Sequence, residues 1–461
     1  MERYLIIGGG VAAARAAEAV GDLDTEAEVV VVSEETEPFY RRPQLRDVLA
    51  GRLSAARIMS RPGSSLDERR IRLVAGNRVA AFDPAAHEVT LADGSGLDFT
   101  RALIATGKRA LPRSIEGTSL PGLNSMRTLS EIRRVAGQPQ EDEAMAARGG
   151  ERTAVVYGDT LLALEAVQGL LERGFSTTYL VSGSRLVPAL FDDIASAALE
   201  NRLQAAGAQI VMQAEVTAVL DRDGRSGGYV TREGSVYEAS VVCYCDDYEP
   251  ALGFLCPGDS LVVGPSYATA WDDVFAAGDV ISPRNYMSYL QAWRGGAAAG
   301  ALMAGGEETV RSPVPMMNWR VCGLSLAAVG LTVVGYRSGY GEMRGGSSLA
   351  PGGLGDYYKK LVFDPDDVLV GAFLLGNVAE AGALEEAVRE GRHKKQLDAG
   401  MLKQMFEVTL RTQFRGVECP VCRHEMQLEP GAAAGDRAVC PVCGVEFELE
   451  QAEHGFRAVA V

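Results

Sequence analysis

A glycine-rich motif close to the N-terminus limits how this chain can fold more than any other feature. The apolar run at residues 4–7 leads into GGGVAA at residues 8–13, which fits G-x-G-x-x-A and ends at Ala13. Gly8 permits a tight turn, and Gly10 lets the backbone approach a pyrophosphate. The helix predicted after the motif then offers N–H groups and a positive dipole end to that anion. The motif therefore predicts a βαβ unit that binds a dinucleotide.

The residues after the motif continue this pattern. An alanine-rich stretch is followed by an apolar run at residues 29–32, which predicts the second strand of the unit. Glu34 lies just beyond this run, about 20 residues after the glycines, where an acid can accept a hydrogen bond from a ribose hydroxyl. The first nucleotide site is therefore predicted to be intact.

A second copy of the pattern, at residues 155–165, is eroded. Thr160 stands where the second glycine should be, so its side chain would crowd a pyrophosphate, and Asp159 adds a negative charge beside it. The next apolar run ends near Val181, and no acid stands there to hold a ribose hydroxyl. We therefore expect the second nucleotide fold to bind NAD(P)H poorly, and NAD(P)H is a doubtful cofactor.

Composition disfavours several classes of function. The formal net charge of −16 argues against nucleic acid as a partner, because phosphate contacts need clustered Lys and Arg. No apolar run reaches the roughly 18 residues of a membrane span. The N-terminus enters a strand pattern directly, without a signal-peptide pattern. These observations predict a cytoplasmic protein and leave open a homo-oligomer.

The order of strand and helix patterns predicts an α/β fold class. Strand patterns alternate with alanine-rich helix patterns over residues 1–310, which is typical of open parallel sheets with two Rossmann-like folds. The run at residues 274–280 is predicted to resume the first of these folds. Further strand patterns predict a separate α/β piece after residue 313, and a helix is predicted over residues 396–413. The strand candidates of this later piece are residues 329–335, 360–363 and 368–375.

These motifs resemble those of the FAD-dependent pyridine nucleotide-disulphide oxidoreductases, which carry two dinucleotide folds. The nearest branch contains rubredoxin and ferredoxin reductases and the flavin part of NADH-dependent nitrite reductase. The matching segments are residues 8–13 with Glu34, PFYRRP at residues 38–43, ATG at residues 105–107 and FAAGD at residues 275–279. The set is specific and covers most of the chain.

The resemblance implies an extended FAD, with Asp279 holding its ribityl chain. It also implies that a helix start near residues 291–293 faces the pyrimidine edge of the flavin, where a positive dipole end favours the reduced, anionic form. No catalytic side chain beyond the flavin is identified. The residues assigned to FAD in this way are Gly8, Gly10, Ala13, Glu34, Arg42, Pro43, Ala105, Thr106, Gly107, Gly278, Asp279, Gln291, Ala292 and Trp293.

The resemblance also implies the domain boundaries. An FAD-binding domain would comprise residues 1–112 and 251–312, interrupted by a degenerate NAD(P)-binding-like domain at residues 113–250. A C-terminal α/β interface domain would follow at residues 313–395. Residues 396–461 would form a helix and a zinc-ribbon tail.

Two features of the family's disulfide reductases are missing. The segment at residues 41–50 lacks their cysteine pair, and His393 lies in a charged run instead of their catalytic His-Pro context. Direct electron transfer by the flavin is therefore expected, and thiol–disulfide chemistry is not.

Other departures concern charge around the two nucleotide sites. The family's Gly-x-x-Pro-Asn turn reads DYEPA at residues 247–251, which adds negative charge where an anion would have to lie. The family's lysine near the flavin is replaced by Asp47. Its usual partner is retained as Glu165, which could pair with Arg46 or Arg42 instead.

Two Cys-x-x-Cys pairs in the tail form the strongest local motif. Cys419 and Cys422 are separated by residues 423–439 from Cys440 and Cys443. Four thiolates at this spacing predict a tetrahedral metal site, because the short segment between them cannot otherwise build a core. The second pair, CPVCG, resembles rubredoxin and leaves redox-active iron open. The short loop and the residue after the first pair favour structural zinc over iron.

These features favour an FAD-dependent oxidoreductase subunit that transfers electrons between its flavin and a protein redox partner or larger redox complex. Direct use of NAD(P)H is not expected, and the zinc-ribbon tail would dock the partner. Two alternatives stay open. One is an NAD(P)H-dependent reductase of a rubredoxin, ferredoxin or similar carrier, and the other is a flavoprotein scaffold in which FAD is structural.

Overall fold

A computed structural model gives the fold of this protein, and its contacts divide the chain into two compact units, Met1–Leu324 and Ser325–Val461. The residues that the structure describes are 2–59, 71–111, 115–136, 152–255, 261, 263–264, 266–281, 287–306, 314–334, 340–346, 357–402, 405–408, 416–418, 425–428, 432–439, 446–452 and 455–460.

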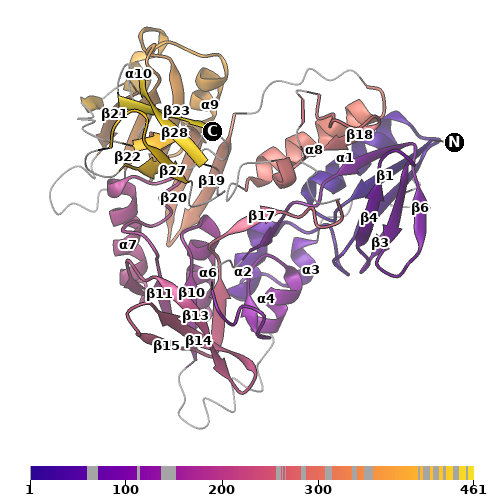
Figure 1. Cartoon of the computed structure of the whole chain (residues 1–461), viewed down its shortest axis with the longest axis horizontal. Coiled ribbons are helices and arrows are strands. Elements are labelled where there is room, and N and C mark those ends of the chain that lie inside the picture. Colours follow the sequence, from indigo (N-terminus) through magenta and orange to yellow (C-terminus); the bar gives the residue numbers. More distant parts are fainter. Residues whose placement is uncertain are drawn as a thin grey trace. The chain divides into compact units, whose positions relative to one another are not determined.

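The first unit begins with a five-stranded parallel sheet (Figure 1). The apolar runs of the first nucleotide motif form its two central strands, which are buried along nearly their whole length. The segment predicted to resume this fold adds the outermost strand, although the second nucleotide fold intervenes in the chain. Across the sheet the strands are β18 (Val274–Ala276), β7 (Arg101–Ile104), β1 (Arg3–Ile7), β2 (Glu28–Ser33) and β3 (Ile71–Ala75).

Two helices rich in small residues, α1 (Val11–Leu23) and α8 (Tyr289–Met303), lie side by side in this unit (Figure 1). A Cβ atom on Gly296 would collide with the backbone of Ala12, and one on Gly300 would meet Ala16 Cα at 2.6 Å. Glycine is therefore required at both positions, because the two backbones approach each other this closely. The contact holds the start of α8 beside the start of α1.

The second nucleotide fold repeats the first. Its five-stranded parallel sheet is again built around the strand of the glycine motif, and helix α6 (Leu161–Glu172) follows that strand. Helix α7 (Asp193–Ala205) lies in sequence directly before the edge strand of this sheet, residues 209–211. Across the sheet the strands are β12 (Gln209–Val211), β11 (Ser176–Leu180), β10 (Thr153–Tyr157), β16 (Val241–Tyr244) and β9 (Leu123–Asn124). The α/β fold class with parallel sheets is thus confirmed.

Shorter elements complete the first unit. Two three-stranded antiparallel sheets are inserted, one before β7 of the first fold and one before β16 of the second, and a further two-stranded antiparallel pair is formed by residues 108–110 and 248–250. The strands are β4 (Val79–Asp83), β5 (Glu88–Leu91) and β6 (Gly96–Asp98), then β13 (Val216–Arg222), β14 (Arg225–Thr231) and β15 (Val236–Glu238), then β8 (Lys108–Ala110) and β17 (Tyr248–Pro250). The remaining elements are α2 (Leu45–Leu49), α3 (Ala55–Ile58), α4 (Leu129–Ala136), and the strand β19 (Met316–Val321).

The second unit is built on an antiparallel sheet in the order β20, β23, β22, β21, β24. The helix predicted over residues 396–413 is wrong, because the chain forms only the short α10 and then a strand that pairs with the edge strand β21. The strand over residues 405–408 pairs antiparallel with β21, which offers it a free edge. The elements are β20 (Leu324–Gly330), β21 (Gly341–Gly346), β22 (Tyr358–Phe363), β23 (Leu369–Leu375), α9 (Ala381–Arg389), α10 (Ala399–Leu402) and β24 (Met405–Val408).

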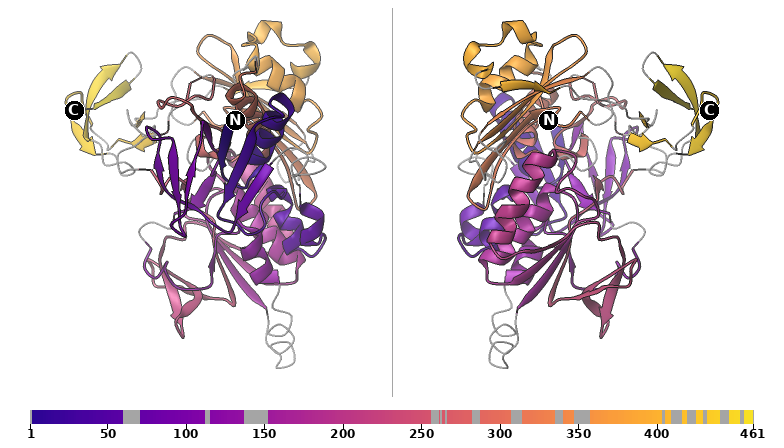
Figure 2. Two further views of the ribbon diagram at one scale, coloured as in Figure 1. Left: turned by 90° about the vertical axis from the view of Figure 1, so that its right-hand side faces the viewer. Right: turned by 90° about the vertical axis from the view of Figure 1, so that its left-hand side faces the viewer.

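The tail forms two small antiparallel sheets, and Figure 2 shows its last two strands as a ribbon that ends at the C-terminus. Val417, Met426, Phe447 and Leu449 are buried together in a small core. The four cysteines of the predicted metal site lie outside the described residues. The strands are β25 (Gly416–Glu418), β26 (Glu425–Gln427), β27 (Arg437–Val439), β28 (Glu446–Ala452) and β29 (Gly455–Ala460).

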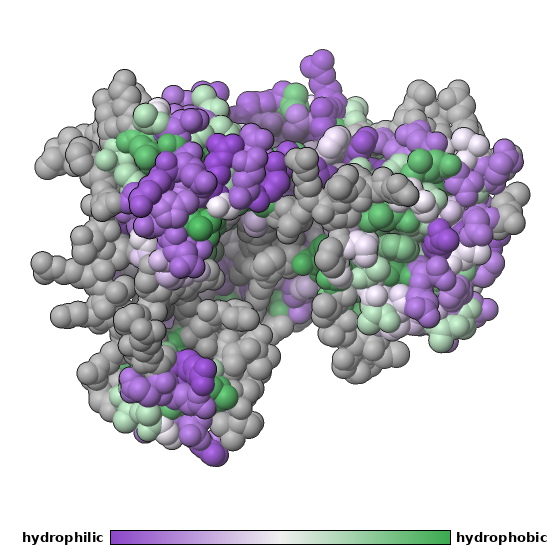
Figure 3. All heavy atoms as spheres, turned by 90° about the horizontal axis from the view of Figure 1, so that it is seen from above, coloured by the Kyte–Doolittle hydropathy of each residue, from purple (hydrophilic) through white to green (hydrophobic). Residues whose placement is uncertain are grey.

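One face of the molecule shows many polar side chains among its described residues (Figure 3). Hydrophilic side chains cover much of the described face seen in Figure 3, in keeping with the formal net charge of −16. Among the helices made of described residues, none has the length and apolar character needed to span a membrane.

Candidate functional site

The starts of both nucleotide folds line one cavity of about 1770 Å³ in the first unit. Gly10 at the start of α1 and Thr160 at the start of α6 both belong to its wall. Parallel strands bring their carboxyl ends, and the helix starts that follow, to the same edge of a sheet, where ligands of such folds bind. The cavity is therefore the candidate site.

The first glycine motif fits a dinucleotide. Gly8 has φ 137°, and a Cβ there would collide with the carbonyl group of Ala105, so only glycine permits this turn. Gly10, in contrast, has ordinary extended backbone, and a Cβ there would meet no atom within 4 Å. The space that Gly10 leaves is open to the cavity. Nearby, Thr106 Oγ1 is shielded from solvent and has no hydrogen-bond partner among the described residues. A pyrophosphate and its sugar hydroxyls would fill this space and meet these groups.

Most of the residues that the resemblance assigns to FAD line the cavity. They are Gly8, Gly10, Glu34, Arg42, Pro43, Ala105, Thr106, Gly107, Gly278, Asp279 and Ala292.

Three of the predicted residues lie outside this lining. Ala13 is fully buried in the core beneath α1, and the backbone N–H of Gln291 donates to Ser288 Oγ at the start of α8. Trp293 is 39% exposed, with the Arg15 guanidinium 4.5 Å from its ring centroid. Successive residues of a helix point about 100° apart, so Ala292 in the cavity wall turns Trp293 outward.

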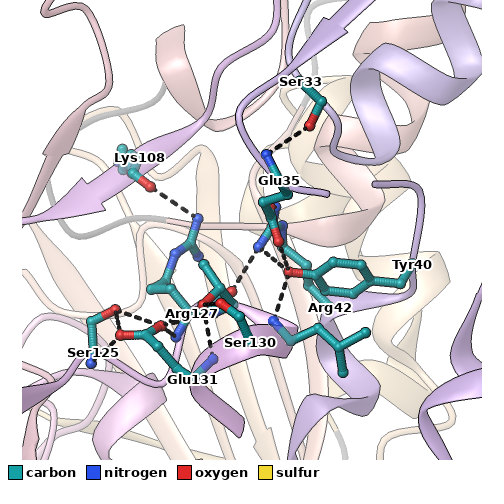
Figure 4. A network of polar contacts seen from close by, with 11 residues as sticks. Ser33, Glu35, Tyr40, Arg42, Lys108, Ser125, Arg127, Ser130 and Glu131 are labelled. Carbon is teal, nitrogen blue, oxygen red and sulfur yellow. Dashed lines mark hydrogen bonds and ion pairs between the residues drawn. The ribbon is translucent and has the colours of Figure 1, made fainter. Parts of the chain in front are cut away.

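A polar network holds Arg42 at the cavity (Figure 4). The Arg42 guanidinium forms an ion pair with Glu35 and donates to the Tyr40 hydroxyl at 2.8 Å. The Tyr40 hydroxyl donates to Glu35 at 2.6 Å and accepts from the backbone N–H of Leu129 at 3.1 Å. Arg42 is therefore fixed and its charge is balanced within the first fold.

Lys108 and Arg127 are among the other basic residues that line the cavity. Burial lowers the pKa of Lys108 to about 8, and the charge of Arg127 lowers it further while Asp279 opposes the shift. Burial also lowers the pKa of Arg127, and the Arg42 charge adds to that effect. Cations whose pKa values are lowered by burial and by a neighbouring positive charge favour an anionic ligand such as a phosphate. The sequence reasoning missed both residues, although Lys108 directly follows the Ala-Thr-Gly motif.

Arg127 is positioned by a carboxylate cap at the start of α4 (Figure 4). The Glu131 carboxylate accepts from the backbone N–H groups of Ser125, Arg127 and Thr128 at 2.7, 3.1 and 3.0 Å. The Arg127 guanidinium in turn donates to the Lys108 carbonyl at 3.4 Å. This local arrangement has no motif that a single sequence would reveal.

In the second fold, the chain's own groups occupy the corresponding positions. The Thr160 hydroxyl is buried and donates to the carbonyl oxygen of Cys245. The Asp159 carboxylate accepts from the backbone N–H of Ser182 at 3.0 Å and also from its hydroxyl. The backbone N–H of Asp159 donates to Asp246 Oδ1 at 2.9 Å. Two carboxylates therefore lie at the turn where a second pyrophosphate would bind.

The strand register shows which residue of the second fold stands at the position of the ribose-binding acid. The N–H of Gly8 donates to Val32, and the N–H of Gly158 donates in the same way to Leu180. Two residues beyond Val32 is Glu34, so its counterpart is Ser182. The assignment to Val181 is wrong by one residue, because the apolar run extends past the end of β11.

The pairing proposed for Glu165 is not formed by Arg42, which binds Glu35 instead. Arg46 lies close enough for its charge to lower the pKa of Glu165, but its guanidinium donates to the Arg320 carbonyl and, at 3.4 Å, to Gln168. Among the described residues Glu165 therefore has no hydrogen-bond or ion-pair partner.

Comparison with known proteins identifies the family. The model of the pyridine nucleotide-disulphide oxidoreductase family matches residues 2–296. The chain is 31% identical, over 61% of its length and 68% of the relative's, to the 5,5'-dehydrodivanillate O-demethylase ferredoxin reductase subunit of a Sphingobium species. It is 25% identical, over 68% and 77% of the two lengths, to the benzene 1,2-dioxygenase system ferredoxin–NAD(+) reductase subunit of Pseudomonas putida.

A solved structure shares the fold. A ferredoxin reductase from Rhodopseudomonas palustris superimposes with a TM-score of 0.73 at 18% sequence identity, over 87% of this chain and 98% of that one. The overall fold of this chain is therefore similar to that of a ferredoxin reductase.

The chain belongs to the pyridine nucleotide-disulphide oxidoreductase family. It is an FAD-dependent oxidoreductase, and membership of the family implies FAD and usually NAD(P)H. Within the part of the chain that the structure describes, no group of three His, Cys, Asp or Glu side chains could hold a metal ion.

Proposed function

We propose that this protein transfers electrons between a bound FAD and a protein redox carrier, and that its second nucleotide fold does not use NAD(P)H directly. The contrast between the two folds carries the proposal. Gly10 leaves open space at the first helix start, whereas Thr160 and Asp159 fill the second.

The first fold offers the groups that FAD needs. Gly10 leaves room for the pyrophosphate, and Arg42 with Arg127 supplies positive charge on the same cavity wall. Glu34 is suited to an adenosine ribose, and Asp279, whose carboxylate accepts from the N–H of Ser288 at 3.1 Å, is suited to the ribityl chain. When bound, FAD supplies both one-electron and two-electron chemistry. It can therefore exchange electrons with a hydride donor or with a one-electron carrier.

The second fold presents the wrong charge for a second dinucleotide. Asp159 and Asp246 lie at the start of α6, where N–H groups would otherwise attract a pyrophosphate. Like charges within a few ångströms in a partly buried site oppose each other by about 4 kcal/mol at an effective dielectric constant near 20. The backbone N–H and the hydroxyl of Ser182, at the position of the ribose-binding acid, both donate to Asp159 and are therefore already occupied.

The names of the relatives support a protein carrier as the partner. Both curated relatives are named as ferredoxin reductase subunits, and a flavin reached through a large cavity is compatible with electron exchange with such a carrier.

A second candidate is an NAD(P)H-dependent reductase of such a carrier. The name of the Pseudomonas putida relative, a ferredoxin–NAD(+) reductase subunit, favours it. In that case the second fold would have to accept a dinucleotide despite Thr160 and Asp159.

For the tail, we propose that Cys419, Cys422, Cys440 and Cys443 hold a structural zinc ion. The spacing of the two cysteine pairs supports this. Each pair follows directly after one strand of an antiparallel hairpin, β25 or β27.

The test is a transfer experiment with the purified protein. The flavin is reduced with dithionite under anaerobic conditions and mixed with an oxidised ferredoxin or rubredoxin. We expect the carrier to be reduced and the flavin to be reoxidised. A protein that holds no FAD, or whose reduced flavin passes electrons to neither carrier, would refute the proposal. Parallel reduction by NADH and NADPH separates the two candidates.

A further inference from the structure

One ionisable side chain in the cavity has no part in the arrangement described so far. Glu165 lies in the second turn of α6 and lines the cavity, as do Leu161 and Leu162 of the same helix. Leu45 and Arg46 of α2 line it as well, and α2 contacts α6. Glu165 is therefore on the stretch of wall where the first nucleotide fold meets the second.

The surroundings of this carboxyl leave it unpaired. The one cation of α2 that is close, Arg46, directs its Nη1 to the Arg320 carbonyl, and its Nε lies 3.8 Å from Asp47 Oδ1. Arg46 is thus near enough for its charge to lower the pKa of Glu165, but it directs its hydrogen bonds to other groups. The Glu165 carboxyl forms no hydrogen bond or ion pair with a described residue, so it stabilises no described contact of the fold.

Burial raises the pKa of Glu165 to about 7. Asp47 raises the pKa further, while Arg46 on α2 and Arg127 before α4 lower it. These are the charged groups that face Glu165 from the elements around it, and none is on α6 itself. Near neutral pH the carboxyl therefore exists in both forms, which suits a group that gives and takes protons.

We propose that Glu165 is the proton-exchanging group of this cavity. It gives up its proton when two electrons enter the bound flavin and recovers it when they leave. The O–H bond of the carboxyl would break and its proton would pass to the reduced ring system, and on reoxidation the proton would return to the carboxylate, so that Glu165 is deprotonated while the flavin is reduced. Two electrons add two negative charges to the flavin, so one proton brings the added charge on the flavin to minus one. The electrons come from the donor in use, which is dithionite in the test below. The proposal rests on the proposed function in assuming that FAD binds in this cavity.

The physical advantage is charge balance in a place with little solvent. Two negative charges on one buried ring system are costly, and a nearby acid can move one of them onto its own carboxylate, which the charges of Arg46 and Arg127 favour.

The test uses infrared spectra of the FAD-containing protein, oxidised and after reduction by dithionite. Three proteins are compared: wild type, Glu165→Gln, and Glu172→Gln as the matched control. Glu172 lies on the same helix but is paired with Arg52 and accepts from Gln168 at 2.6 Å. Circular dichroism and FAD content check that each variant is folded.

We expect wild type and Glu172→Gln to show a protonated-carboxyl band that titrates on either side of the pKa of about 7. The band should lose intensity on reduction and recover on reoxidation. Glu165→Gln should lack both changes, while Glu165→Asp should keep a titrating band at a shifted pH.

A band that titrates equally in Glu165→Gln, or no band near neutral pH in wild type, would overturn the proposal. So would a titrating band that reduction leaves unchanged. These outcomes differ from failure of the proposed function, which is absence of FAD or of carrier reduction, because the titration of the oxidised protein needs no carrier.

Discussion

The carboxylate of Asp159 accepts a hydrogen bond from the backbone N–H of Ser182, with 3.0 Å between Oδ1 and N. The bond ties the turn after β10 to the turn after β11, the two places that a dinucleotide would occupy in this fold. In the first fold the matching turns are Gly9 and Glu34, and Ser33 Oγ accepts there from Glu35 at 3.2 Å. The serine bond stays within the turn after β2, whereas the Asp159 bond joins two turns and brings a negative charge to them.

Restoring the second fold should create NADH reduction. The variant Asp159→Gly with Thr160→Gly and Ser182→Glu removes the carboxylate, opens the turn and supplies the ribose acid. We expect the rate of flavin reduction by NADH at fixed concentration to rise at least roughly tenfold, about 1.4 kcal/mol in apparent affinity. Anaerobic absorbance measurements provide the rate, and Ser182→Glu alone serves as the control. No gain in the triple variant would show that these residues do not limit binding.

Replacing Gly10 should empty the FAD site without damaging the fold. A Cβ at this position meets no atom within 4 Å, and its backbone is ordinary for any residue, so Gly10→Val should fold normally. Its side chain would project into the space for the pyrophosphate, and the FAD content should fall by roughly tenfold or more. Gly382→Ala on α9, also free of contacts, is the matched control. Full FAD content in Gly10→Val would place the cofactor elsewhere.

Glu165→Gln should change how stability depends on pH. The pKa of Glu165 is raised from 4.5 to about 7, so the folded protein keeps this proton over a range in which the unfolded chain has lost it. The contribution of the group to stability therefore falls as pH rises from 4.5 to 7. Above this range, Glu165→Gln should be more stable than wild type by roughly 2–3 kcal/mol. Urea unfolding across pH, with Glu172→Gln as reference, measures the difference. Parallel profiles for all three proteins would contradict the assignment.

The metal proposal predicts a local effect in the tail. Cys440→Ser should release the zinc and unfold the small core of Val417, Met426, Phe447 and Leu449. Flavin absorbance should not change, because the first unit has its own cores. Metal analysis and limited proteolysis provide the readout, and Cys322→Ser is the control outside the tail. Stoichiometric iron, or unchanged protease resistance without metal, would contradict a structural zinc.

The parallel folds could be predicted because their signals are local. The glycine motifs are short, and each lies between an apolar run and an alanine-rich stretch, so periodicity places strand and helix directly. The residues of the first site follow from the same motifs, and most of them do line the cavity.

The rest depends on contacts between distant segments. Lys108 and Arg127 are 19 positions apart in the sequence, and only the fold brings both of them to the cavity. The counterpart of Glu34 depends on strand register, which shifts the expected position from Val181 to Ser182. The strand β24 replaces a predicted helix because β21 offers it an edge.

The most direct test of the central claim is anaerobic stopped-flow mixing of the oxidised wild-type protein with NADH and with NADPH, followed in the visible flavin band. We predict little or no bleaching at concentrations that rapidly reduce the Asp159→Gly, Thr160→Gly, Ser182→Glu variant, whereas dithionite should bleach both proteins and a ferredoxin or rubredoxin should then reoxidise them. Rapid bleaching of the wild-type flavin by either nucleotide would contradict the account and make the protein an NAD(P)H-dependent reductase.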